Sequence, residues 1–239
     1  NSNFFVSLEA GEYVLTLVER GQRADLPFVV ELLQRLHADG LPVPYGVPTR
    51  TGECLRELAD KPALLQPRLA GKHIEQPNAH HCAEVGSWLA RMHLCTQAQP
   101  LERRSDRGLD WMLSEGPLQA LQLDDEALEL LRASLAEVAQ AQAAVLALPR
   151  ANLHADLFRD NAMFEGTHLT GVIDFYNACS GPMLYDLVIS LNDWCSDDAG
   201  TIDLPRAQAF LGAYAALRPF TAAEADVWPV MLRVACVRF

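Results

Sequence analysis

The segment His154-Ala-Asp-Leu-Phe-Arg-Asp-Asn161 constrains this chain more than any other part of its sequence. Within it, Asp156 precedes Asn161 by five positions, and Asp174 follows Asn161 by thirteen positions at the end of an apolar run. Strand-like residues on both sides of a turn near Gly166 would close that gap as a hairpin. The sequence therefore predicts that three oxygen-bearing side chains converge at one end of a small sheet.

These three side chains suit phosphoryl transfer. One carboxylate has to lie beside the attacking hydroxyl, and two oxygen ligands have to hold Mg²⁺ on the nucleotide phosphates. Mg²⁺ prefers oxygen ligands and keeps several waters, so one Asn and one Asp are sufficient. The spacing His-x-Asp-x-x-x-x-Asn is typical of a kinase catalytic loop, in which the Asp is the base and the Asn a metal ligand. A solvated turn would explain Asp156 and Asn161, but it would leave Asp174 unexplained.

The first part of the chain has the pattern of a small sheet with one helix. Residues 4–8 and 13–18 are rich in β-branched and aromatic residues, and a turn at 9–11 would join them as a hairpin. Asp25 is placed to cap a helix that ends before Gly40 and has Pro27 in its first turn. Residues 63–66 predict a short buried strand, and we place a boundary between two lobes directly after it.

The remainder is mainly helical. Apolar residues at steps of three and four predict helices around 85–92 and over 128–145, the second capped by Asp124 or Asp125. Thr221 and Glu224 form a capping box for a last helix, which Pro229 either kinks or begins. Further elements are expected as strands at 153–154, 162–164 and 169–175 and as helices at 182–191 and 205–217.

The composition argues against several classes of partner. Half of the 239 residues are hydrophobic, enough for a sizeable core, and the formal net charge is −12. Without a basic run to meet nucleic-acid phosphates, nucleic acid is not an expected partner. The sequence contains no run of about 18 apolar residues, so no membrane span is expected. The six cysteines are scattered without a C-x-x-C pair, which is typical of buried, reduced thiols in a cytoplasmic protein.

Three longer stretches of the sequence indicate a more specific family. Leu153-His-Ala-Asp-Leu-Phe-Arg-Asp-Asn161, Gly171-Val-Ile-Asp-Phe-Tyr-Asn-Ala-Cys179 and Leu184-Tyr-Asp-Leu-Val-Ile-Ser-Leu-Asn-Asp-Trp-Cys195 resemble the homoserine kinases of the aminoglycoside phosphotransferase and choline kinase superfamily. Residues 1–5 and 13–17 resemble the small lobe of those kinases, so the resemblance covers nearly the whole chain. It implies a bilobal, protein-kinase-like α+β fold. A small antiparallel sheet with one helix would span residues 1–66, and a larger helical lobe would span residues 67–239, with both chain ends incomplete.

The resemblance also implies roles for individual residues. Asp156 would orient and deprotonate the acceptor hydroxyl, and Asn161 and Asp174 would bind Mg²⁺. His154 would brace the catalytic loop rather than react, and Asp186 would hold that loop by hydrogen bonds from below. The implied reaction is phosphorylation of L-homoserine by ATP in threonine biosynthesis, and the implied cofactors are ATP and Mg²⁺.

The nucleotide side departs from the usual kinase pattern. Kinases of this fold place a lysine on an early strand to hold the phosphates, whereas Thr16 stands at that place here. We expect Arg20, or a residue not contained in this sequence, to supply the missing charge, and Ser2 and Asn3 to donate hydrogen bonds to phosphate. The adenine would lie against the connector at 63–69, which contains Gln66.

The acceptor side is assigned from charge alone. Homoserine carries an ammonium group, which Asp160, Asn177 or Asp193 would meet. It also carries a carboxylate, which the planar guanidinium of Arg159 would clamp. A surface ion pair explains Arg159 equally well.

Four other interpretations stay open. A metal hydrolase would use His154 and Asp156 as ligands, but further His or Cys ligands at a suitable spacing are missing. A serine hydrolase requires G-x-S-x-G, which Ser180 does not match. A pseudokinase or binding module would explain Thr16, although Asp156, Asn161 and Asp174 are all intact. A kinase of the same superfamily would take choline, ethanolamine, a thiosugar or an aminoglycoside. The sequence predicts no oligomeric state.

Overall fold

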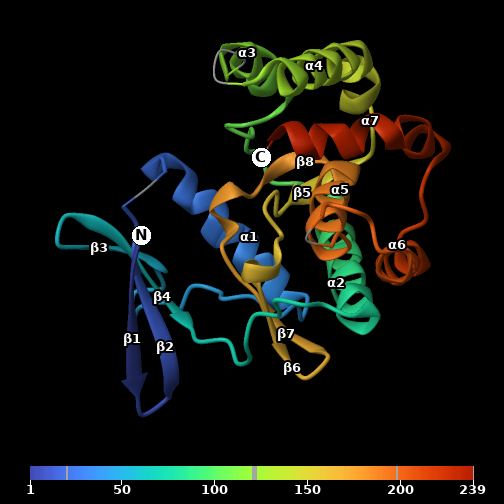
Figure 1. Ribbon diagram of the computed structural model, residues 1–239. Helices are drawn as coiled ribbons and strands as arrows, with labels where there is room; N and C mark the ends of the chain where they lie inside the picture. Colours follow the sequence, from blue (N-terminus) through green and yellow to red (C-terminus); the bar gives the residue numbers. More distant parts are fainter. Residues whose placement is uncertain (20, 120–122, 198, 239) are drawn as a thin grey trace. The chain divides into compact units, whose positions relative to one another are not determined.

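The computed structural model describes residues 1–19, 21–119, 123–197 and 199–238. Its elements divide into two compact units (Figure 1). The first unit contains Asn1–Gln76 and Arg159–Asn177, and the second contains Pro77–Phe158 and Ala178–Phe239. The catalytic-loop segment predicted from the sequence therefore contributes residues to both units. The predicted lobe boundary after residue 66 stays a prediction.

A four-stranded antiparallel sheet forms the body of the first unit. The predicted hairpin is confirmed, because Ser2 pairs with Leu17 and Leu8 with Gly11. The predicted strand at 63–66 is also confirmed, as part of a longer strand. The strands are β1 (Ser2–Leu8), β2 (Gly11–Leu17), β3 (Leu55–Leu58) and β4 (Lys61–Pro67), in the order β1-β2-β4-β3.

Helix α1 (Leu26–Ala38) is the predicted helix of the first unit. Its stripe of Val29, Leu32 and Leu36 is buried, and Gly40 follows its end with a φ of 79° that a glycine adopts without strain. Asp25 occupies the position before the first helical residue, but its side chain makes no capping hydrogen bond. The prediction of an Asp25 cap is wrong because its backbone is itself helical, at the end of the short 3-10 turn Arg23–Asp25.

A second, smaller hairpin also belongs to the first unit, although its residues come much later in the sequence. Its strands are β6 (Ala162–Glu165) and β7 (His168–Val172), with Gly166 in the left-handed conformation at the turn. Lys72 and Phe164 exchange both backbone hydrogen bonds, at 2.9 and 2.8 Å, and the amide of Val172 donates to the carbonyl of Pro42 at 3.0 Å. The bonds of Lys72 attach the hairpin to the chain segment after β4, and the bond to Pro42 attaches it to the segment between α1 and β3.

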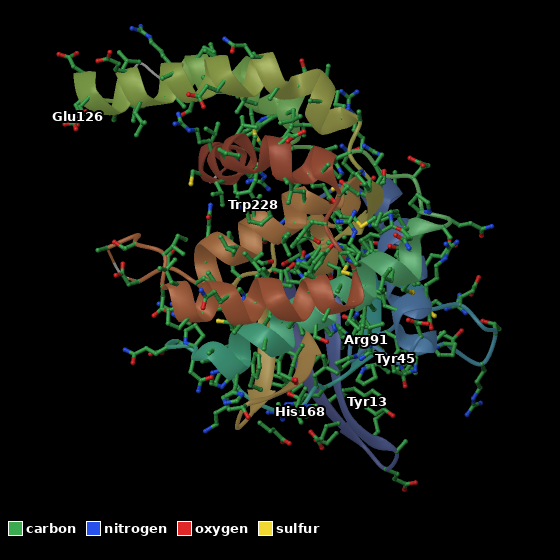
Figure 2. All side chains as sticks on the ribbon, turned by 90° about the vertical axis from the view of Figure 1, so that its right-hand side faces the viewer. Tyr13, Tyr45, Arg91, Glu126, His168 and Trp228 are labelled. Carbon is green, nitrogen blue, oxygen red and sulfur yellow. The ribbon has the colours of Figure 1, made fainter. Side chains whose placement is uncertain are left out.

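The second unit is built from helices around a two-stranded sheet of β5 (Arg150–Leu153) and β8 (Cys179–Pro182). α2 packs along α6, and α7 lies between α4 and α5, with side chains filling the spaces between them (Figure 2). The helices are α2 (Ala79–Gln97), α3 (Leu109–Gln119), α4 (Asp125–Leu146), α5 (Met183–Trp194), α6 (Leu204–Leu217) and α7 (Ala222–Arg238).

The helix ends in the structure show which of the predicted capping and proline positions are correct. Asp124 caps α4 by accepting from the amide of Ala127 at 2.9 Å. Thr221 and Glu224 form the predicted reciprocal box, with bonds of 2.9 and 3.3 Å. Pro229 lies inside α7, so the alternative that it begins the helix is wrong.

Other findings concern the predicted strands, cysteines and membrane spans. The strand predicted at 169–175 is too long, because β7 ends at Val172 and Asp174 turns the chain with a φ of 63°. Among the described residues no cysteine forms a disulfide, and Cys82, Cys179 and Cys195 are buried. No helix in the described ranges has the length and apolarity needed to cross a bilayer.

Close contact between α2 and α6 generates a stability prediction. A Cβ on Gly86 of α2 would overlap the backbone carbonyl of Phe210 on α6, which cannot rotate away as a side chain can. Gly86→Ala should therefore destabilise the protein by about 1–3 kcal/mol, although alanine is the better helix former. Urea denaturation measures the change.

Gly212→Ala on α6 is the matched control, because a Cβ there meets no atom within 4 Å. It should be neutral or stabilise by up to about 1 kcal/mol. Equal effects of the two substitutions would contradict the close-packing account.

Candidate active site

A buried carboxylate holds the predicted catalytic loop. Asp186 lies in the first turn of α5, is 0% exposed, and accepts hydrogen bonds from two successive backbone amides. The amide of His154 donates to Oδ2 at 2.7 Å, and the amide of Ala155 donates to Oδ1 at 2.7 Å. Both bonds to a charged acceptor are short, as charge-assisted bonds are. The structure thus places Asp186 against the loop, in the position that its predicted supporting role requires.

Asp186 also belongs to a buried polar chain. Nε2 of His93 lies 3.2 Å from Oδ2 of Asp186, and Nδ1 of His93 lies 2.8 Å from the hydroxyl of Tyr214. All three side chains are at most 1% exposed. Burial raises the pKa of Asp186, but the hydrogen bond and charge of His93, with His154, outweigh it and hold that pKa below its ordinary value. The carboxylate therefore stays ionised.

His93 and Tyr214 were not predicted from the sequence. His93 stands beside the apolar stripe of α2, and Tyr214 lies on a different helix, 121 positions along the chain. No spacing rule connects two such positions. A lone buried polar residue next to an apolar stripe is the available signal, and it is a weak one.

The loop around Asp156 has a fixed backbone. Ala155 adopts a φ of 61°, a left-handed conformation that is uncommon for residues other than glycine. The bonds to Asp186 hold it there, and the indole nitrogen of Trp194 donates to the carbonyl of Leu157 at 3.1 Å on the other side of Asp156. His154 is fully buried, close enough to Asp186 to influence its pKa, which suits bracing rather than reaction. Asp156 itself is half-buried.

The first unit brings together the two predicted metal ligands. Asn161 ends a short 3-10 turn, and its carbonyl accepts from the amide of Ile173 at 2.9 Å, so the hairpin sets Asn161 beside the residue before Asp174. Asp174 is exposed, and its charge helps burial to raise the pKa of Tyr176 to about 12. An amide oxygen and a carboxylate form the hard donor set that suits Mg²⁺. The groups of three or more His, Cys, Asp or Glu needed for other metal sites do not occur in the described residues.

The alternation of side chains along the strands shows which predicted nucleotide-binding residues share a face of the sheet. Asn3 pairs with Thr16, so both lie on one face of the sheet, and Gln66 shares that face through its partner Val14. Ser2 lies on the opposite face, where its hydroxyl donates to Glu19 at 2.8 Å. Arg20 lies outside the described residues.

The predicted acceptor residues do not all fall in one unit. Arg159, Asp160 and Asn177 belong to the first unit, and Asp193 lies on α5 in the second. Arg159 donates to the carbonyl of Glu75 at 2.9 Å, while Asp160 and Asn177 are exposed. Their role toward an acceptor stays a prediction.

A cavity of about 480 Å³ lies within the second unit. Its lining includes Leu153 of β5, Tyr185 of α5 and the ion pair of Arg104 with Asp110. None of the four predicted acceptor residues is among the residues that line it. No sequence pattern predicted this cavity, because its walls come from six helices and strands far apart along the chain.

Comparison with known proteins then places the chain. Residues 1–220 match the phosphotransferase enzyme family, APH. A homoserine kinase from Pseudomonas aeruginosa (strain LESB58) is 66% identical over 239 residues, which is all of this chain and 76% of that protein. The chain belongs to the homoserine kinases of the phosphotransferase enzyme family. A homoserine kinase from Methylobacillus flagellatus is 42% identical over the full chain and 74% of its own length.

Solved structures confirm the predicted fold class of these kinases. A microcompartment-associated aminopropanol kinase superposes with a TM-score of 0.75 over 99% of this chain and 83% of that chain, at 19% identity. An amicoumacin kinase solved in complex with AMP-PNP, Ca²⁺ and Ami gives the same TM-score over 99% of this chain and 76% of that chain, at 14% identity. At such identities the likeness establishes the α+β kinase-like fold.

The buried carboxylate generates a prediction on stability and pH. Asp186→Asn leaves one loop amide facing an NH₂ group instead of an oxygen, so it should cost at least about 1–3 kcal/mol. Because the folded pKa of Asp186 lies below its ordinary value of 3.8, its contribution is complete above pH 3.8 and is lost as the pH falls further. Urea denaturation of both proteins at neutral and acidic pH measures this.

The exposed residue Asp226 on α7 provides the control, since Asp226→Asn should leave the stability unchanged. A stability difference between the wild type and Asp186→Asn that grows as the pH falls below 3.8 would contradict the assignment.

Proposed function

We propose that the protein transfers the γ-phosphoryl group of ATP to the side-chain hydroxyl of L-homoserine. One observation carries the proposal: the chain is 66% identical along its entire length to a protein named homoserine kinase. Homoserine kinases from other organisms match it over the full chain at 41–44% identity, which supports the same activity. The product, O-phospho-L-homoserine, would serve threonine biosynthesis.

The base of the reaction is Asp156. Its carboxylate orients the homoserine hydroxyl and accepts its proton as the oxygen attacks phosphorus. The new bond joins that oxygen to the γ-phosphorus, the bond to the β,γ-bridging oxygen breaks, and ADP leaves. Hydrogen bonds hold the backbone on both sides of Asp156. This supports the role, because little reorganisation is then needed when the transition state forms.

Asn161 and Asp174 hold the divalent cation, which we infer to be Mg²⁺. When bound, the cation offsets the charge that develops on the phosphates. The hairpin that closes between Asn161 and Asp174 holds the backbone of Asn161 beside Ile173, the residue before Asp174. The kinase-like amicoumacin kinase, whose structure contains AMP-PNP and Ca²⁺, is consistent with such a site.

The contacts to the nucleotide are assigned by the face of the sheet, and the contacts to the acceptor by charge. Asn3, Thr16 and Gln66 share one face of the sheet, and we place the nucleotide on that face. Arg159, whose guanidinium also donates to the carbonyl of Glu75, is the candidate to clamp the homoserine carboxylate through its planar fork. Asp160, Asn177 and Asp193 remain the candidates for the ammonium group.

Turnover with a panel of acceptors tests the function. The purified protein would be given MgATP with L-homoserine, choline, ethanolamine, methylthioribose or an aminoglycoside, and ADP release and the phosphorylated product would be measured. We expect turnover with homoserine alone. Turnover confined to another acceptor would refute the substrate but keep the phosphotransferase, and binding of MgATP without any turnover would favour a pseudokinase.

Asp156→Asn serves as the matched variant in that assay. It keeps the size of the side chain but removes the base, so kcat should fall by about 10²- to 10⁴-fold while the Kd for MgATP stays unchanged. A variant that retains full activity would show that Asp156 is not the base, and would also expose a contaminating kinase.

A further inference from the structure

Thr16 makes one specific contact on the sheet. It pairs with Asn3 across the β1–β2 hairpin, and its hydroxyl donates a hydrogen bond to Oδ1 of Asn3 at 2.8 Å. Thr16 is only 5% exposed, whereas Asn3 lies on the surface. The residue at the position where kinases usually place a phosphate-binding lysine is therefore a short, buried side chain. Its hydroxyl proton is already used within the sheet.

This bond orients the amide group of Asn3. The amide is planar, and its oxygen and nitrogen lie on opposite edges, so an oxygen turned toward Thr16 turns the NH₂ group away from it. Within the described part of the chain, Asn3 makes no other side-chain hydrogen bond. Its two N–H donors are therefore presented in a defined direction from the surface of the sheet.

The lysine of this sheet, Lys61, lies on the opposite face from Asn3 and Thr16. Lys61 is one of two lysines in the sequence, and its ammonium group pairs with Glu19. The same carboxylate accepts from Ser2, and the bonds from Lys61 and Ser2 hold the pKa of Glu19 below its usual range. Because Ser2 pairs with Leu17, it lies on the face opposite Asn3 and Thr16. The Glu19 cluster is therefore a separate feature of the opposite face.

The face that carries Asn3 is in the same compact unit as the candidate metal ligands. That unit contains the four-stranded sheet together with Asn161 and Asp174. Within it, α1 contacts both β3 and the short turn Phe175–Asn177, which directly follows Asp174. One helix thus contacts both the sheet and the turn that directly follows Asp174, one of the two residues that would hold the metal.

We propose that Thr16 is a positioning residue, whose hydroxyl holds the Asn3 amide as a neutral hydrogen-bond donor to the nucleotide phosphates. In this chain an oriented amide then does what a lysine does in other kinases of the fold. The inference rests on the proposed function, since it requires MgATP to bind on the face that carries Asn3.

Binding measurements without acceptor test it. Isothermal titration would give the Kd for MgATP and for adenosine in the wild type and in Thr16→Val, which has nearly the same shape but no hydroxyl. We expect Thr16→Val to bind MgATP about tenfold more weakly and adenosine unchanged, because only the phosphate contact is lost. Thr16→Ser restores the hydroxyl and should bind MgATP within about twofold of the wild type.

Asn3 and Ser7, two exposed residues of β1, provide a test position and a control. Asn3→Asp keeps the acceptor for Thr16 but replaces the donor by a charge that repels phosphate, so MgATP should bind at least about tenfold more weakly. Ser7→Ala, near the turn of the same hairpin, should leave both dissociation constants unchanged. Melting temperatures of all four variants show whether any loss reflects unfolding instead.

Three results would overturn the proposal: unchanged MgATP binding in Thr16→Val, equal losses for MgATP and adenosine, or a Thr16→Ser variant as weak as Thr16→Val. The test is separable from the proposed function. The predicted binding pattern without any homoserine turnover would refute the acceptor and keep the role of Thr16, whereas turnover with unchanged binding in Thr16→Val would do the reverse.

Discussion

The ionised, fully buried carboxylate of Asp186 accepts hydrogen bonds from two successive backbone amides of the catalytic loop. The rest of the site depends on these two bonds. A buried charge is costly unless hydrogen bonds satisfy it, and here His93 and the loop amides do so together. The left-handed backbone of Ala155 is the local consequence. It turns the chain directly before Asp156, which is why a residue remote from the reacting atoms would matter for catalysis.

The second constraint is the hairpin that begins where the loop ends. The amide of Ile173 donates to the carbonyl of Asn161, so the two candidate metal ligands lie at neighbouring ends of the hairpin. Close packing keeps that piece in place: a Cβ on Gly171 would overlap Leu69, and one on Gly71 would overlap the carbonyl of Phe164. The base then belongs to one compact unit and the metal ligands to the other.

Local signals in the sequence predicted much of this. The spacing from Asp156 to Asn161 and Asp174 indicated the loop and hairpin, and capping residues such as Asp124 marked helix ends correctly. β8 was missed because Gly181 and Pro182 are unusual in strands, and pairing with β5 overrides that preference. The chain from Tyr214 through His93 to Asp186 was missed because it joins three helices, which no local pattern encodes.

The most direct test of this division of roles is the binding of Mn²⁺, as a spectroscopic substitute for Mg²⁺, in the presence of a non-hydrolysable ATP analogue. Electron paramagnetic resonance would give the Mn²⁺ affinity of the wild type, Asp174→Asn and Asp156→Asn. We expect Asp174→Asn to weaken Mn²⁺ binding by about tenfold or more, and Asp156→Asn to leave it unchanged. Wild-type Mn²⁺ affinity in Asp174→Asn, or an equal loss in both variants, would contradict this division of roles.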